Sequence, residues 1–425
     1  MTVAIFLAIL LTSVIIGIPI AFSLLMCGLG LMWYLDMFDP QIVAQSLING
    51  ADNFTLLAIP FFVFAGDVMN VGGMAKRLVD LPMKLVGHKA GGLGYVVIIA
   101  AVIMASLSGS PAADTAAIAA IMFPMMASAG YPKEGSVGLI ASGGIIAPII
   151  PPSIPFIVIG VTASVSISQL FLAGIVPGVL MGVTLCLVWS FRARKFAAAK
   201  KATGAEIWAS FKSSVWALML PVIIIGGFKT GVFTPTEAGA IASAYALLVS
   251  IFVYRELTLK SIYKCLLNTV KTTAVIMLMV AAAQVSAYLM TVADLPLMVT
   301  ELLKPMIGHP TLLMALILAL LLVMGMVLDL IPIVLILVPV LMPLVQAAGI
   351  NEIYFCVMFI ICCAIGLITP PVGNVLNVVS SVTRVPFERS AAGILPYAGA
   401  LVVLMLLMLI FPEIIIGPLE FMTGK

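Results

Sequence analysis

The sequence contains little charge. Only 9% of its 425 residues are Asp, Glu, Lys or Arg, and 63% are hydrophobic, whereas soluble domains have about 25% and about 45–50%. This balance excludes an ordinary soluble domain and predicts an all-α polytopic membrane protein. At about 20 residues per span, a chain of this length allows about a dozen crossings. The net charge of +3 gives no indication of nucleic-acid binding.

Signature motifs of several catalytic classes are also missing. The sequence has no HExxH, GxSxG or P-loop motif, which argues against an intramembrane enzyme and against an ATP-driven pump. His88 and His309 are predicted in loops rather than at membrane depth. The six cysteines have no metal-binding spacing and are predicted to be small core residues. We therefore predict that the protein is not an enzyme.

Residues 143–153 interrupt an apolar run that is long enough to cross a membrane. Here Pro148, Pro151 and Pro152 each remove a backbone donor and clash with the preceding turn, so a regular helix cannot continue. Freed backbone groups are tolerated in hydrocarbon only where they are buried in protein or line a watery cavity. The stretch predicts a broken transmembrane helix over about 136–163, a feature typical of transporter binding sites.

The same pattern occurs again 219 residues later. Pro370–Pro371 correspond to Pro151–Pro152, and Ala348–Gly349 correspond to Ala129–Gly130. Several matches at one offset predict an internal repeat. The second broken helix is expected over about 353–380.

A helical hairpin is predicted before each broken helix. The first joins helices over about 90–106 and 112–129, and the second covers about 311–348 with a turn at Gly325–Pro332. Lys89 and Lys133 flank the first hairpin, so both of its ends are expected in the cytoplasm. The first hairpin is therefore predicted to be re-entrant from inside, and the second from outside.

Charge sets the expected orientation of the other segments. A basic loop is placed in the cytoplasm, and it contains Arg192, Arg194, Lys195, Lys200 and Lys201. The second half ends near the acidic residues Glu413 and Glu420, on the outer side. This contrast predicts an inverted-topology repeat.

Further spans are expected over 2–16, 17–35, 168–191, 213–228 and 272–291. No Lys or Arg precedes Lys76, so the first span is predicted to be retained rather than cleaved as a signal peptide. Thr234 and Glu237 fit a capping box that begins another helix. A surface arm is expected over 37–52 on the outer side. An amphipathic stretch with Lys260, Lys264 and Lys271 is expected on the inner side.

The four chain breaks are predicted to meet near the membrane midplane. Unpaired carbonyls at helix C-termini suit Na⁺, and N–H groups at helix N-termini suit a carboxylate. Polar side chains gather at these breaks: Ser106, Ser108, Ser110, Asp114, Ser153, Asp329, Thr369, Asn374 and Asn377. No Lys or Arg is expected near them.

Plainer roles stay open for these residues. A serine can simply donate to a carbonyl one turn back, and the two asparagines can join neighbouring helices. Asp114 could equally cap the second helix of its hairpin. Asp329 is expected near a cation, because an unpaired carboxylate is costly in a bilayer.

The chain resembles the large membrane subunit of the tripartite ATP-independent periplasmic (TRAP) transporters, the DctM-like proteins, over essentially its whole length. The motifs that carry the resemblance lie at 106–110, 144–153, 234–239 and 366–374. Their character is similar to the 2,3-diketo-L-gulonate branch. The resemblance implies Na⁺-coupled uptake of a small organic anion, such as a sugar acid, across the bacterial inner membrane. It also implies a small membrane subunit, a periplasmic substrate-binding protein and an elevator mechanism.

Residue roles follow from the same resemblance. One sodium site would use Ser106 with carbonyls around Gly144 and Ala147. The other would use Gly325, Gly366, Thr369 and Val372, with Asp329 nearby. The substrate would be bound by Ser108, Ser110, Ser153, Asn374 and Asn377. A stand-alone sodium-coupled anion symporter is the alternative.

The resemblance also implies a division into scaffold and transport parts. Residues 1–75 and 213–304 would form the scaffold with its two arms. Residues 76–190 and 305–425 would form the two transport repeats, and 191–212 the basic cytoplasmic loop.

Overall fold

Helices make up nearly all of the structure, a computed structural model that describes residues 2–193, 196 and 201–424. The first half contains α1 (Thr2–Ile16), α2 (Ile20–Tyr34), α3 (Pro40–Ala51), η1 (Phe54–Leu57), α4 (Ala58–Val71), α5 (Met74–Val86), α6 (Gly92–Ser108), α7 (Pro111–Ser128), α8 (Lys133–Gly144), α9 (Ile154–Ala163) and α10 (Ile167–Ala193). The second half contains α11 (Gly204–Thr230), α12 (Pro235–Leu248), η2 (Val249–Val253), α13 (Leu259–Val292), α14 (Leu295–Leu302), α15 (Lys304–Ile307), α16 (Pro310–Gly325), α17 (Leu330–Ala347), α18 (Glu352–Gly366), α19 (Asn374–Thr383), α20 (Phe387–Ile410) and α21 (Glu413–Thr423).

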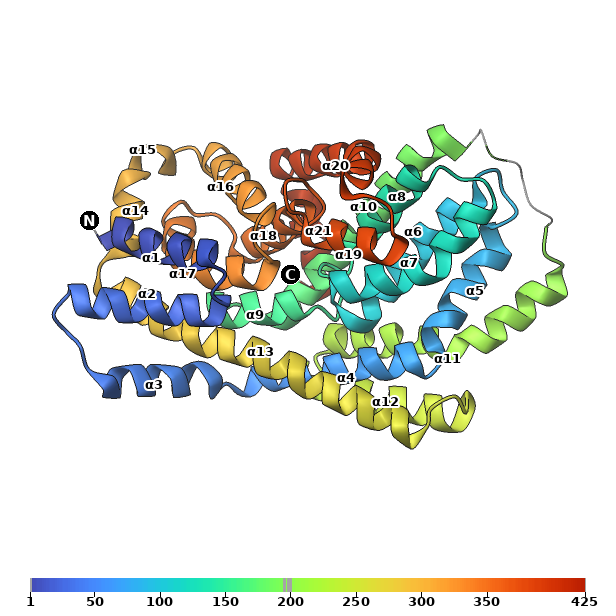
Figure 1. Cartoon of the computed structure of the whole chain (residues 1–425), viewed down its shortest axis with the longest axis horizontal. Helices are drawn as coiled ribbons and strands as arrows, with labels where there is room; N and C mark the ends of the chain where they lie inside the picture. The colour runs from blue at the N-terminus through green and yellow to red at the C-terminus, as the bar shows by residue number, and fades with distance from the viewer. Residues whose placement is uncertain (1, 194–195, 197–200, 425) are drawn as a thin grey trace.

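The two halves repeat one order of helices. Helices α6 to α9 begin within one residue of the positions 219 before the starts of α16 to α19. Contacts between the halves also come in matching pairs, since α7 packs on α19 as α17 packs on α9, and α2 packs on α13 as α12 packs on α4. In Figure 1 the long helix α13 runs diagonally across the molecule from the α1–α3 end towards α12. The core is therefore shared between the halves.

Both predicted hairpins and both predicted interruptions are present as backbone features. Helices α6 and α7 pack on each other across a turn at 109–110, and α16 and α17 do so across a turn at 326–329. Residues 145–153 separate α8 from α9, and residues 367–373 separate α18 from α19. The Pro151–Pro152 and Pro370–Pro371 bonds are both cis.

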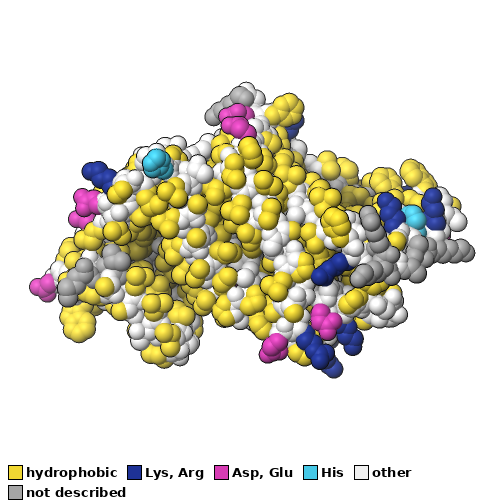
Figure 2. All heavy atoms as spheres, turned by 90° about the horizontal axis from the view of Figure 1, so that it is seen from above, with side chains coloured by type: hydrophobic (Ala, Val, Ile, Leu, Met, Phe, Trp, Pro, Cys, Tyr) yellow, Lys and Arg dark blue, Asp and Glu magenta, His cyan; other side chains and the backbone are white. Residues whose placement is uncertain are grey.

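The outer surface is strongly apolar. Among the described residues, eight helical segments are long and apolar enough to cross a membrane. Large hydrophobic side chains such as Ile15 and Trp33 are more than four-fifths exposed. Figure 2 shows hydrophobic side chains over most of one face, with charged side chains mainly at its margins. A lipid environment explains this surface, and the prediction of a multi-pass membrane protein is confirmed.

Helix α13 differs from the sequence expectation. A surface stretch followed by a separate span over 272–291 was predicted, but Leu259–Val292 forms one continuous helix of 34 residues. No Pro or Gly interrupts this segment. The change from polar to apolar composition near Lys271 therefore does not end the helix.

The corresponding segment in the first half is broken. There the chain leaves α3 at Asp52 and starts again after Asn53, whose side-chain oxygen accepts a hydrogen bond from Thr55 N at 2.9 Å. A side chain that bonds to nearby backbone in this way competes with helix continuation. The predicted arm over 37–52 is thus a separate helix, α3.

Other boundaries moved or were missed. Helix α11 begins at Gly204 rather than near 213, and α5, α14, α15 and α21 were not expected as separate helices. The capping box at Thr234 and Glu237 is present with both hydrogen bonds. In the predicted basic loop, Arg194, Lys195 and Lys200 lie outside the described residues.

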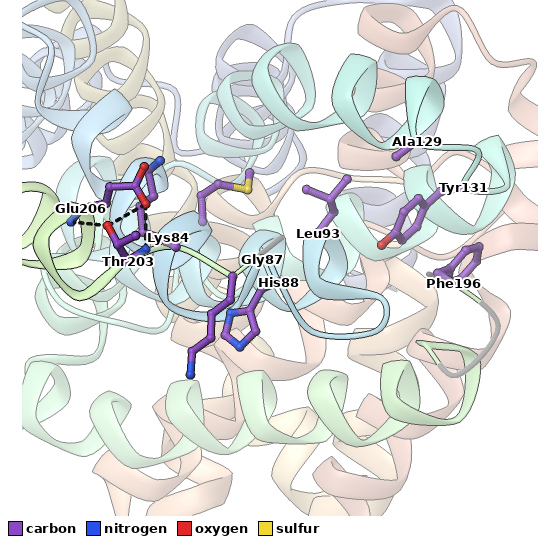
Figure 3. Close-up of a pocket in the computed structure, with 12 residues that line it drawn as sticks. Lys84, Gly87, His88, Leu93, Ala129, Tyr131, Phe196, Thr203 and Glu206 are labelled. Carbon is purple, nitrogen blue, oxygen red and sulfur yellow. Dashed lines mark hydrogen bonds between the residues drawn. The ribbon is translucent and has the colours of Figure 1, made fainter. Parts of the chain in front are cut away.

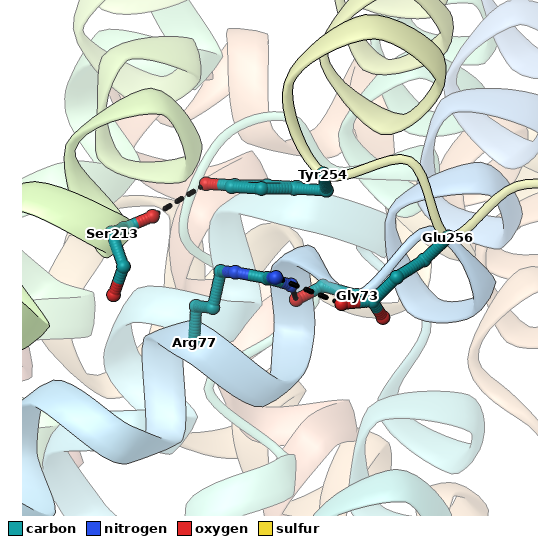
Figure 4. A network of polar contacts seen from close by, with 5 residues as sticks. All are labelled: Gly73, Arg77, Ser213, Tyr254 and Glu256. Atoms are coloured by element: carbon teal, nitrogen blue, oxygen red, sulfur yellow. Dashed lines mark hydrogen bonds and ion pairs between the residues drawn. The ribbon is translucent and has the colours of Figure 1, made fainter.

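One polar network ties α5 to the second half. The Arg77 guanidinium pairs with Glu256 at 2.8 Å, donates to Gly73 O at 2.8 Å and lies 3.9 Å from the centre of the Tyr254 ring. Tyr254 in turn donates to Ser213 O in α11 at 2.8 Å. Figure 4 shows the guanidinium beneath the tyrosine ring and beside the carboxylate. This network joins the start of α5 to α11 and to the segment after α12.

We expect Arg77→Ala to lower the melting temperature of the purified protein in detergent. It removes an ion pair, a hydrogen bond and a cation–π contact at once, and we expect a cost of about 1–2 kcal/mol because water screens the partly exposed pair. The neighbouring Lys76 is exposed, so Lys76→Ala serves as the control. Equal melting temperatures for both variants would contradict the stabilising role of this network.

Candidate functional site

A cavity of about 450 Å³ lies where both hairpin turns and both broken helices meet. Its lining comes from six helices and the adjoining turns: Val63, Asp67, Asn70, Gly109, Ser110, Pro111, Ala112, Ala113, Ile154, Pro155, Asn268, Lys271, Thr272, Val275, Ile276, Met279, Asp329, Leu330, Ile331, Asn374 and Val375. Its size is within the range of about 300–1,000 Å³ that is usual for small-molecule sites.

Four helix N-termini open onto this cavity. The first residues of α7, α9, α17 and α19 all line it, beginning at Pro111, Ile154, Leu330 and Asn374. Helix N-termini carry partial positive charge and free N–H groups, so they favour an anion. The opposite ends of the interrupted pairs, the C-termini of α6, α8, α16 and α18, carry the carbonyls that suit a cation.

The first hairpin contributes Ser110 to the cavity. Ser110 caps α7, and its Oγ accepts a hydrogen bond from Ala113 N at 3.5 Å. Asp114 is buried in the first turn of that helix. The suggestion that Asp114 caps the helix is therefore wrong, because Ser110 occupies the cap position.

The predicted first sodium site lies at the ends of α6 and α8, which pack on each other. Ser106 is buried, and its hydroxyl donates to Ile103 O at 2.6 Å. Gly144 and Ala147 are buried as well, and Ala147 N donates to Gly144 O at 3.2 Å. Ser108 ends α6, but its side chain lies outside the described residues.

Ser153 lies deeper than predicted. It is fully buried, its hydroxyl donates to Pro148 O, and its Oγ accepts from Phe156 N at 3.2 Å as the cap of α9. Among the described residues, Ser153 does not line the cavity, whereas the next residue, Ile154, does. In the structure the hydrogen bonds of Ser153 stabilise the backbone between α8 and α9.

At the second break the backbone itself is tightly packed. A Cβ atom on Gly366 would lie 2.6 Å from Gly325 Cα, so the two glycines bring α16 and α18 into backbone contact. Met326 O in the hairpin turn accepts hydrogen bonds from Val372 N and Gly373 N, both at 3.2 Å. The second hairpin and the second broken helix are thus joined through main-chain atoms.

The side chains predicted at this break have local partners. Thr369 donates to Ile365 O, and Asn377 Nδ2 donates to Val372 O, each at 2.7 Å. Asn377 is not among the described residues that line the cavity. Its hydrogen bond positions the carbonyl of Val372, which is a predicted sodium ligand.

Asp329 and Asn374 both line the cavity, as expected of a shared site. Asp329 caps α17, with Oδ1 accepting from Leu330 N at 2.8 Å, and Asn374 is the first residue of α19. The structure therefore brings Ser110, Asp329 and Asn374 together from three segments.

The expectation that no Lys or Arg lies near the breaks is wrong for Lys271. Helices α4 and α13 also line the cavity, and they contribute Asp67, Asn70, Asn268 and Lys271. Because α13 is continuous, Lys271 belongs to a helix that lines the cavity along several turns. One feature of the sequence could have indicated this polar lining. In each of the two helices the two polar residues are three positions apart, so they share one helix face.

A second cavity, of about 430 Å³, lies away from the breaks. It is lined by Lys84 and His88 at the end of α5, by Tyr131, and by Thr203 and Glu206 at the start of α11 (Figure 3). The Glu206 carboxylate accepts from Thr203 N at 2.7 Å, which completes a capping box. Helix capping thus accounts for these two polar side chains.

The sequence matches the family described as "Tripartite ATP-independent periplasmic transporter, DctM component" over residues 6–414. It is 59% identical over 425 residues, all of both chains, to the 2,3-diketo-L-gulonate TRAP transporter large permease protein YiaN of Escherichia coli. It is 58% identical over 422 residues, 99% of each chain, to a putative TRAP transporter large permease protein of Haemophilus influenzae.

Its fold is similar to that of the YdaH transporter of Alcanivorax borkumensis, with a TM-score of 0.64, 14% identity and 88% of each chain covered. The fold, the meeting of hairpin turns with broken helices and the sequence matches agree, and the chain belongs to the DctM family, the large permease components of TRAP transporters.

Proposed function

We propose that this chain carries a small organic anion, a carboxylate or sugar acid, across the bacterial inner membrane by Na⁺-coupled secondary transport. The observation that carries the proposal is the convergence of four helix N-termini on one cavity. Their partial charges favour a carboxylate. The E. coli relative named for 2,3-diketo-L-gulonate supports a sugar acid as the first compound to test.

Sodium would travel with the anion as cargo. The proposed sites lie behind the cavity, at the C-terminal ends of the helices that precede each break. The first comprises Ser106, Gly144 and Ala147. The second comprises Gly325, Gly366, Thr369 and Val372, with Asp329 close by. Carbonyl and hydroxyl oxygens are suitable ligands for a hard cation, and binding at both sites would offset the charge of the carboxylate.

We further infer an elevator mechanism in an inverted-topology repeat. The transport parts would be 76–190 and 305–425, and the scaffold 1–75 and 213–304, joined by the loop 191–212. Main-chain bonds between the second hairpin and the second broken helix support movement of these segments as one body. Helix α5, held by Arg77 to the second half, would link that body to the scaffold.

Reconstitution tests the proposed function. In proteoliposomes that contain this chain, a small TRAP membrane subunit and a periplasmic binding protein, we expect uptake of labelled 2,3-diketo-L-gulonate under an inward Na⁺ gradient. Omission of any component should abolish uptake. Uptake by this chain alone would instead make it a stand-alone symporter, and uptake driven equally by a proton gradient would contradict sodium coupling.

Asp329→Asn and Thr369→Ala test the second sodium site. Each removes an oxygen or a charge near the proposed ion, so we expect the sodium concentration for half-maximal uptake to rise about 5- to 30-fold, the range given by about 1–2 kcal/mol. Asp294 is exposed and Thr383 donates to Val379 O one turn back, as Thr369 does to Ile365 O. Asp294→Asn and Thr383→Ala are the controls. An unchanged sodium dependence in both test variants would remove this site.

Gly366→Ala tests the contact between the second hairpin and the second broken helix. The added methyl group would meet the Gly325 backbone at 2.6 Å, which requires α16 and α18 to separate, so we expect at least a tenfold loss of uptake. A Cβ on Gly399 in α20 meets nothing within 4 Å, and Gly399→Ala should keep full activity. Wild-type uptake by Gly366→Ala would show that the close contact is not required.

A further inference from the structure

Helices α4 and α13 form one wall of the cavity, and this wall carries its own polar groups. Asp67 and Asn70 come from successive turns of α4, and Asn268 and Lys271 from successive turns of α13. Asn268 Nδ2 donates to Asp67 Oδ2 at 2.8 Å, which joins the two helices. Asn70 Oδ1 is buried and accepts no hydrogen bond from the described residues. These four polar side chains therefore belong to two helices that are otherwise largely apolar.

Lys271 is the cationic member of this wall. It lines the cavity and is exposed, and it forms no ion pair within 4 Å among the described residues. It lies within a helix of 34 residues whose apolar part is suited to a membrane. A lysine that lines a cavity and has no ion pair leaves its charge available to an anion bound there.

The two carboxylates that line the cavity together with Lys271 have hydrogen-bond donors of their own. Asp67 accepts from Asn268, and Asp329 accepts from Leu330 N at 2.8 Å. Asp67 lies on the same wall as the lysine, whereas Asp329 lies on the wall of helix N-termini. An anion in the cavity would thus be bordered both by Lys271 and by four helix N-termini.

We propose that Lys271 binds the carboxylate of the transported anion from the α13 side of the cavity. The inference rests on the proposed function, since it takes the cargo to be an organic acid. The ammonium group supplies a full charge, in addition to the partial charges of the helix N-termini. Asn268 and Asn70 lie beside it and offer amide groups for the hydroxyls of a sugar acid.

The test is uptake of labelled 2,3-diketo-L-gulonate by the complete transporter in proteoliposomes, as a function of substrate concentration. We expect Lys271→Gln to raise the KM at least tenfold while the sodium dependence stays unchanged. Lys271→Arg keeps the charge and should stay within about threefold of wild type, a difference of about 0.7 kcal/mol. Lys271→Met, which keeps the stem without the charge, should match Lys271→Gln.

Lys264 provides the matched control, because it precedes Lys271 by two turns on the same helix and is exposed but outside the cavity lining. Lys264→Gln should leave the KM unchanged. Wild-type uptake tests the proposed function itself, while the ratio of KM values tests Lys271. A transporter that works with the same KM in wild type, Lys271→Gln and Lys271→Met would overturn the inference and leave the proposed function intact.

A double variant separates substrate binding from simple charge balance with Asp67. If Lys271 only neutralised Asp67, then Asp67→Asn combined with Lys271→Gln would restore the wild-type KM, and the proposal would fail. If Lys271 binds the anion, the double variant should keep the raised KM. The two single variants complete the cycle and measure the coupling between the side chains.

Discussion

Backbone groups that lose their helical partners inside a membrane constrain this whole structure. Each of the four breaks frees N–H and C=O groups that hydrocarbon cannot satisfy. The structure brings all four breaks together, and the helix N-termini that follow them line one cavity. The remaining helices then surround this arrangement and present an apolar surface outward. The cavity at the meeting point of the breaks is a consequence of collecting these groups in one place.

The repeat makes this arrangement approximately symmetric, but side chains differ between its two copies. Ser110 and Asp329 both cap the second helix of a hairpin, one with a hydroxyl and the other with a carboxylate. At the second break, glycines bring the two backbones into contact, whereas Ser106 occupies the position that corresponds to Gly325. The two halves thus share one backbone plan and differ in charge.

Much of the fold could be predicted because prolines, glycines and charges mark the ends of membrane helices. The paired prolines located both breaks, and Thr234 with Glu237 located a helix start. The hydrogen-bond partners and orientations of the side chains were harder to predict. Ser153 and Asn377 lie at the predicted places in the chain, yet their hydrogen bonds go to nearby backbone. Lys271 was assigned to a surface because composition changes there, but only packing of α13 against α4 determines where that helix face points.

The continuity of α13 has a mechanical consequence. At 1.5 Å per residue it is a rod of about 50 Å, longer than the hydrocarbon core of about 30 Å, and one rigid element joins Leu259 at its start to Lys271 in the cavity. Force applied to its first turns would move the cavity wall directly. The corresponding first-half segment is divided at Asp52 and Asn53. A displacement of α3 would therefore bend the chain at these two residues. The start of α13 would therefore transmit motion to the cavity, whereas α3 would move independently of it.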